Sequence, residues 1–230
     1  MKLFDIFKKK KNIYELDYNI PVLEDSLLSV RIESTRYIVD ATLNGHLSLC
    51  HRVDLLSEIH DVHTVNKIFF ECVKKVYPIW HKAFPHNNIV MQMLLKANSF
   101  LYLNEGDKHS FSQMGMEHND YLLDLYKNDD INMSMPGLVG LAAQSLMYSI
   151  AYDAGMILEI DEYAGEDDDV FDYEGWNPDF YASMAYSGGN PFANEGNISL
   201  RKKFWNWYLD TVEAFSSTTA PPPVISLDFD

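Results

Sequence analysis

LRKKFWNWYLDTVEAF, residues 200–215, is the stretch that decides the fold of this chain. Its large side chains recur at three- and four-residue spacing, which places them on one face of an α-helix. These residues are Leu200, Phe204, Trp207, Tyr208, Thr211, Val212 and Phe215. Trp205 and Leu209 widen that face, so we expect the helix to be buried around much of its girth. Asn197 or Ser199 can cap its N-terminus, and its aromatic side chains can anchor a hydrophobic core.

The rest of the chain follows the same helical period. Nearly every apolar run joins the next by a short loop, and the sequence has no clean series of alternating strands. We therefore predict a mainly α, single-domain bundle of about eight helices, with an acidic loop before the last two. The helical domain should span residues 21–216, between a basic, irregular N-terminal segment (1–20) and a proline-rich tail (217–230).

Particular segments carry sharper expectations. Two helices, 22–30 and 31–49, are expected at the start, and Asp61 should cap a later helix that Pro78 stops or kinks. The most apolar run, 135–160, repeatedly contains Gly, Ala and Ser. Its polar Gln and Asp residues argue against a membrane span. The run instead predicts a buried central helix whose neighbours approach closely.

The charge of the chain limits its partners. The 230 residues carry a formal net charge of −16, and beyond the lysine-rich residues 1–11 there are 13 basic and 33 acidic side chains. Such a surface repels nucleic acid and anionic lipid and attracts a basic protein. We therefore expect a protein partner and neither nucleic acid nor a membrane.

The two cysteines and the N-terminus indicate the compartment. Cys50 and Cys72 lie in apolar helical patterns without CxxC spacing, so we expect reduced, buried thiols and no zinc site. The lysines of residues 1–11 follow a very short apolar segment, which is the reverse of a secretory signal. These features predict a cytoplasmic protein.

An enzymatic alternative depends on histidine. His60 and Asp61 form an HD dipeptide like that of the all-α, metal-dependent HD phosphohydrolases. His46 or His51 and Asp120 or Asp153 would complete the ligand set. Against this, Asp61 also fits a helix cap, and the chain has no phosphate-binding glycine motif, nucleophile elbow or HExxH motif. We therefore expect no catalytic residues, no metal site and no cofactor.

A second feature is the acidic loop, residues 159–179, which holds ten carboxylates. It lacks the ligand spacing and central Gly of a calcium-binding EF-hand loop. One interpretation is a solvated, mobile loop, because so many like charges are not buried unpaired. The other is a phosphate-mimicking surface that docks on a basic protein such as a nuclease, with Tyr163, Phe171, Tyr173 and Trp176 as anchors. The candidate binding residues are Glu166, Asp167, Asp168, Asp169, Asp172, Tyr173 and Glu174.

Two blocks of sequence resemble a known family. DFYASMAYSGGNPF at residues 179–192, followed by RKKFWNWYL at 201–209, is similar to the end of the all-α immunity-protein family five of bacterial polymorphic toxin systems. VYPIW at residues 76–80 resembles the middle motif of that family, and the resemblance covers residues 26–215. Its most specific part is FW-x-WYL, residues 204–209.

The resemblance implies a non-enzymatic, cytoplasmic protein that binds and neutralises a cognate toxin domain. It also implies that the motif residues belong to the core and do not contact the toxin. These core residues are Trp80, Pro85, Phe204, Trp205, Trp207 and Tyr208. The identity of the toxin and the oligomeric state remain open at this point.

Overall fold

The computed structural model describes residues 22–59, 61–154, 167–172 and 175–216. These residues form nine α-helices and two short 3₁₀ turns, and no strand occurs among them. The α-helices are α2 (Val22–Ala41), α3 (Leu49–Ser57), α4 (Val62–Ala83), α5 (Ile89–Leu103), α6 (His109–Glu117), α7 (Asn119–Tyr126), α8 (Ile131–Ala151), α10 (Pro178–Ser187) and α11 (Ile198–Ser216). The 3₁₀ turns are η2 (Asp168–Val170) and η4 (Pro191–Ala193). The predicted all-helical bundle, with α10 and α11 after the acidic loop, is confirmed.

Helix α8 is the predicted central helix. It contacts α4, α5, α6, α7 and α10, and most of its residues from Pro136 to Ile150 are buried. Its glycines allow this close packing, because a Cβ on Gly137 would lie 2.5 Å from the backbone nitrogen of Tyr126. A Cβ on Gly140 would lie 2.4 Å from a methyl carbon of Leu122. The expectation of close neighbours along this run is therefore confirmed.

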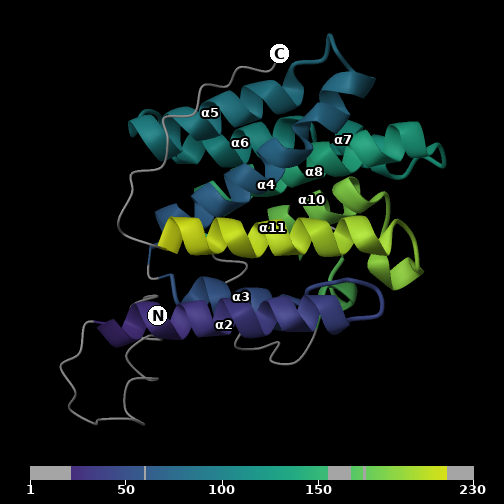
Figure 1. Ribbon diagram of the computed structural model, residues 1–230. Coiled ribbons are helices and arrows are strands. Elements are labelled where there is room, and N and C mark those ends of the chain that lie inside the picture. Colours follow the sequence, from purple (N-terminus) through teal and green to yellow (C-terminus); the bar gives the residue numbers. More distant parts are fainter. Residues whose placement is uncertain (1–21, 60, 155–166, 173–174, 217–230) are drawn as a thin grey trace.

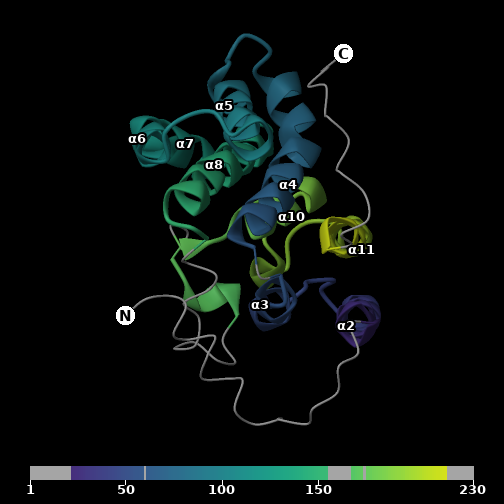
Figure 2. The same ribbon diagram turned by 90° about the vertical axis from the view of Figure 1, so that its left-hand side faces the viewer.

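Helix α11 lies between two groups of helices. Figure 1 shows it between α4 and α10 on one side and α2 and α3 on the other, and Figure 2 shows α2 and α3 at the edge of the molecule. Polar contacts join α11 to α2 in antiparallel order: Arg36 pairs with Asp210 at 2.8 Å, and Asn206 donates to Asp40 at 3.2 Å. The aromatic helix thus connects both groups of helices, as its wide buried face predicted.

The N-terminus of α11 is capped as expected, since Asn197 Oδ1 accepts the backbone N–H of Leu200 at 3.0 Å. The buried face differs from the expected one in two places. Leu200 is 38% exposed, whereas Arg201 is buried and donates to the carbonyls of Asn44, Gly189 and Glu195. Arg201 thereby ties the loop before α11 to the loop after α2.

The predicted helix boundaries at Val30 and Leu49 are wrong, since α2 ends at Ala41 and Leu49 begins α3, and α4 does not stop at Pro78. Residues 22–41 form one continuous helix, α2, because no Gly or Pro separates Val30 from Arg31 and the pattern of buried Ile32, Thr35 and Val39 runs through. Helix α4 continues past Pro78 to Ala83, with Tyr77 and Trp80 buried on either side of the proline. Packing of these two side chains outweighs the one lost backbone hydrogen bond.

None of the described helices is long and apolar enough to cross a membrane. Cys72 is buried and Cys50 is half-buried, and both are free thiols.

Candidate functional site

The acidic turn, residues 167–172, is the described part of the acidic loop. Asp169 and Asp172 are exposed, as expected for a docking surface. Asp168 is 1% exposed and Asp167 is half-buried, so the expectation of a fully solvated loop is wrong for these two acids. Glu166, Tyr173 and Glu174 lie outside the described residues.

Asp168 is buried because it pairs with Arg52 of α3, whose side chain is fully buried. Arg52 Nη2 donates to Asp168 Oδ2, and Nη1 donates to Asp179 Oδ1 at 2.6 Å. The guanidinium also lies 5.7 Å from the ring centroid of Phe180 and 5.3 Å from that of Trp205. One buried cation thus joins α3, the acidic turn, α10 and the aromatic helix α11.

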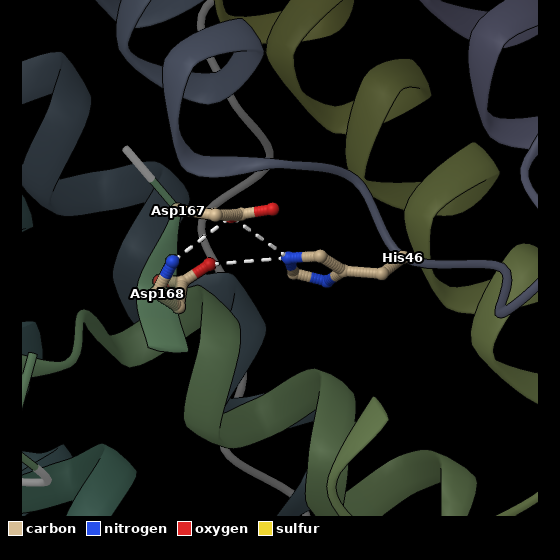
Figure 3. Close-up of side chains that lie close together, drawn as sticks. All are labelled: His46, Asp167 and Asp168. Atoms are coloured by element: carbon tan, nitrogen blue, oxygen red, sulfur yellow. Dashed lines mark hydrogen bonds and ion pairs between the residues drawn. The ribbon is translucent and has the colours of Figure 1, made fainter. Parts of the chain in front are cut away.

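His46 adds a second link to the same acids (Figure 3). Its Nε2 lies 3.2 Å from Asp167 Oδ1 and 3.2 Å from Asp168 Oδ2. The ring is enclosed by Phe180, Phe192 and Trp205 at centroid distances of 5.1 to 5.9 Å. We refer to His46, Arg52, Asp167, Asp168 and Asp179 together as the charge network.

Asp167 also shapes the local backbone. Its Oδ1 accepts the backbone N–H of Leu49, the first residue of α3, and that of Asp168, both at 2.9 Å. A carboxylate at a helix N-terminus satisfies free amides and interacts favourably with the helix dipole. Asp167 therefore caps both α3 and the 3₁₀ turn that follows it in the acidic loop.

The charge network shifts the pKa values of its side chains. Burial lowers the pKa of His46, but hydrogen bonds to Asp167 and Asp168 outweigh it and raise the pKa above the ordinary 6.5. Burial raises the pKa of Asp167, but the hydrogen bond from His46 brings it well below its ordinary range. Burial likewise lowers the pKa of Arg52, and Asp168 and Asp179 more than compensate. The arrangement therefore favours cationic His46 and Arg52 and an ionised Asp167, whereas burial raises the pKa of Asp179 above its ordinary value.

His46, Asp167 and Asp168 also have the composition of a metal site. One ligand atom from each lies within 4.8 Å of the others, and no other such group occurs in the described part of the chain. However, Asp168 Oδ2 already accepts from Arg52, and Asp167 Oδ1 accepts two backbone amides. A divalent cation would have to displace these donors beside a buried Arg, so the geometry fits an ion-pair network better than a metal centre.

The HD ligand set is not assembled among the described residues. Asp61 caps α4, with its carboxylate accepting the backbone N–H groups of His63 and Thr64 at 3.1 Å. His46 faces the acidic turn, and Asp153 pairs with Lys108. His60 lies outside the described residues. The predicted helix cap at Asp61 is confirmed.

The motif residues are mostly core. Trp80, Phe204, Trp205 and Tyr208 are fully buried, as the family resemblance implies. Trp207 is half-buried, with Lys75 Nζ 4.0 Å from its ring centroid. Pro85 is exposed, so its assignment to the core is wrong: it lies in the turn between α4 and α5.

Trp176 does not fit the expected role of an interface anchor. It is 9% exposed, its Nε1 donates to the backbone carbonyl of Asp168 at 2.8 Å, and its ring meets those of Phe180 and Tyr181 edge-on. Trp176 is therefore a core residue that binds the backbone of the acidic turn. The sequence analysis also missed Arg52 and Arg201, since neither has a local signal that distinguishes a buried cation from a surface one.

Comparison with protein families matches residues 32–214 to immunity protein Imm5. No curated protein matches the chain. Because the family match covers more than half of the chain, the protein belongs to the Imm5 immunity-protein family, which is associated in general with toxin neutralisation.

Proposed function

We propose that this Imm5-family protein is a non-enzymatic inhibitor that binds a basic toxin domain, such as a nuclease, in the cytoplasm and blocks its active site or substrate groove. The family match over residues 32–214 is the observation that carries the proposal. The net charge of −16 supports a basic partner, because unlike charges attract over the range of several ångströms set by the salt concentration.

Within this proposal the acidic turn contributes to the toxin contact through its exposed acids, Asp169 and Asp172. Val170, 53% exposed, lies between them and offers an apolar contact. Asp167 and Asp168 act as positioning residues, since their carboxylates hold the turn against His46, Arg52 and the start of α3. A turn fixed in this way presents its outer acids with little loss of conformational entropy on binding.

The mechanism is stoichiometric occlusion. Attraction between the acidic surface and a basic toxin accelerates association, and short-range contacts then set the lifetime of the complex. Binding should therefore weaken as salt is raised, mainly through the association rate.

Co-expression with any toxin domain that is encoded beside this gene tests the function. Survival of the cells together with a one-to-one complex on purification is the expected result. Survival without any complex would indicate enzymatic protection, and absence of protection would refute the proposal.

Substitution of the exposed acids tests the surface. Asp169→Asn with Asp172→Asn should weaken toxin binding about five- to tenfold and reduce its salt dependence. Glu105→Gln with Asp129→Asn removes the same charge from other exposed acids and serves as the control. Equal effects of the two double variants would show that the acidic turn makes no direct contact.

A further inference from the structure

A second surface has the composition of a cation-binding site. A hollow of about 770 Å³ lies between α6, α7, α8 and α10, and none of its lining residues belongs to the acidic turn. We call it the tyrosine groove. Its lining includes Tyr121, Tyr148, Tyr152 and Tyr181 together with Glu117 and Asp120.

The tyrosines give the groove aromatic walls. Tyr152 is 60% exposed, and its ring stacks on that of Tyr148 with a centroid distance of 6.5 Å and an interplanar angle of 25°. Tyr121 is 40% exposed and its hydroxyl accepts a hydrogen bond from Asn87 at 3.1 Å. Tyr181, which is buried, also lines the groove. Exposed aromatic faces carry a negative potential that attracts cations, most strongly the flat guanidinium of arginine.

The two acids of the groove have no cationic partner among the residues that the structure describes. Glu117 ends α6 and Asp120 lies in the first turn of α7, and both are exposed. In the described ranges neither carboxylate forms an ion pair, whereas Asp153, two residues after the end of α8, pairs with Lys108. Both carboxylates are therefore exposed to a cationic side chain of a partner.

The groove is built into the bundle. Gln144 of α8 donates to the backbone carbonyl of Gly115 at 2.7 Å and to Asn119 Oδ1 at 3.0 Å, which joins the walls formed by α6, α7 and α8. The ring of Tyr148 lies directly over Gly115, where an added Cβ would come within 2.8 Å of it. A side chain at position 115 would therefore displace the Tyr148 ring from its place in the aromatic wall.

We propose that the tyrosine groove binds an arginine side chain of the basic partner. The guanidinium would contact Tyr121 and Tyr152 and pair with Glu117 or Asp120, while its alkyl stem would lie against Met116, Leu123 and Leu141. The identification of that partner as the toxin rests on the proposed function, but the preference of the groove for arginine does not. The groove is also connected to the acidic turn, since Ser145 of its lining donates to the carbonyl of Trp176, which in turn bonds Asp168.

Peptides test the groove on the full chain without the toxin. Hexa-arginine should bind measurably in low salt by titration calorimetry and nuclear magnetic resonance, with the largest shifts around residues 116–123 and 141–152. Hexa-citrulline, which has the same shape without the charge, should not bind. Glu117→Gln with Asp120→Asn should weaken hexa-arginine binding about five- to tenfold, and Asp169→Asn with Asp172→Asn should weaken it much less.

Two further variants separate the aromatic contribution from charge. Tyr152→Leu should weaken binding about three- to fivefold, because it keeps an apolar side chain and removes the aromatic face. Tyr37→Leu, at a 77% exposed tyrosine of α2, is the matched control and should leave binding unchanged.

The outcomes distinguish the two proposals. Equal loss of peptide binding in both acidic double variants, or shifts spread over the whole acidic surface, would overturn the groove as a site. Peptide binding in the groove combined with no toxin complex would support the groove and refute the proposed function. A toxin complex that is unaffected by Tyr152→Leu and by Glu117→Gln with Asp120→Asn would show that the toxin binds elsewhere.

Discussion

The charge network and the tyrosine groove place carboxylates in opposite situations. Asp168 and Asp179 are buried and bound to Arg52, and Asp167 is held by His46 and two backbone amides. Glu117 and Asp120 are exposed and have no cationic partner among the residues that the structure describes. Some acids of the most acidic stretch, Asp167 and Asp168, are thus bound within the protein and stabilise the fold. Asp169 and Asp172 of the same dense stretch are exposed, as Glu117 and Asp120 are, so the pairing of an acid says more about its role than the local density of acids does.

The largest expected effect is at the centre of the network. Arg52→Met should destabilise the protein by about 3–5 kcal/mol, because it leaves the buried Asp168 and Asp179 without their cation. Chemical denaturation measures the difference. Arg36→Met is the matched control and should change stability by less than about 1 kcal/mol, since Arg36 pairs with an Asp210 that is 65% exposed. Similar values for the two variants would mean that the network contributes no more than a surface ion pair.

The acids themselves provide the next contrast. Asp168→Asn should cost about 2–3 kcal/mol, because a neutral amide replaces a buried anion bound to Arg52 and His46. Asp120→Asn should leave stability within about 0.5 kcal/mol of the wild type, since its side chain is exposed and forms no ion pair within the described ranges. If the two variants lose similar free energies of unfolding in the same denaturation experiment, the buried and the exposed acid do not differ in their contribution to stability.

A smaller change in stability is expected with pH, and its direction follows from the pKa of His46. His46 has a raised pKa in the folded protein, so its contribution is fully present below the unfolded pKa of about 6.5 and is lost as pH rises through the folded value. The free energy of unfolding should therefore fall as pH rises from about 6 through the folded pKa of His46. His46→Gln should remove that part of the slope, and an unchanged slope would show that His46 is not protonated in the fold.

The smallest expected change in stability is at the groove. Glu117→Gln with Asp120→Asn should leave stability unchanged or raise it slightly, because it removes charge from an acidic surface without breaking an ion pair. Peptide or toxin binding by the same variant should still fall. A loss of stability comparable to that of Asp168→Asn would remove the distinction between the two sets of acids.

The sequence predicted the fold well because hydrophobic spacing is a local signal. The aromatic helix, the Asp61 cap and the close packing at Gly137 and Gly140 were all readable from neighbouring residues. The continuation of α4 past Pro78 was not, because the burial of Tyr77 and Trp80 in the core decides it.

The sites were harder to predict because they join distant segments. Arg52 resembles any surface arginine in the sequence, and only the fold shows that it lies among Asp168, Asp179 and two aromatic rings. The tyrosine groove likewise combines residues 116–123, 141–152 and Tyr181, which share no motif. The acidic loop is recognisable from its composition. The burial of Asp168, however, depends on Arg52 of α3, more than a hundred residues earlier in the chain.

That separation has a consequence for the order in which the protein matures. Arg52 precedes Asp168 by 116 residues and Asp179 by 127. At a synthesis rate of about 5–20 residues per second, its anions leave the ribosome roughly 6–25 s after it does. Such long-range contacts also slow folding. An interrupted chain that ends before Asp179 would lack one of the two anions and all of α11. Only a chain that is complete through α11 can therefore assemble the whole charge network and the aromatic rings around it.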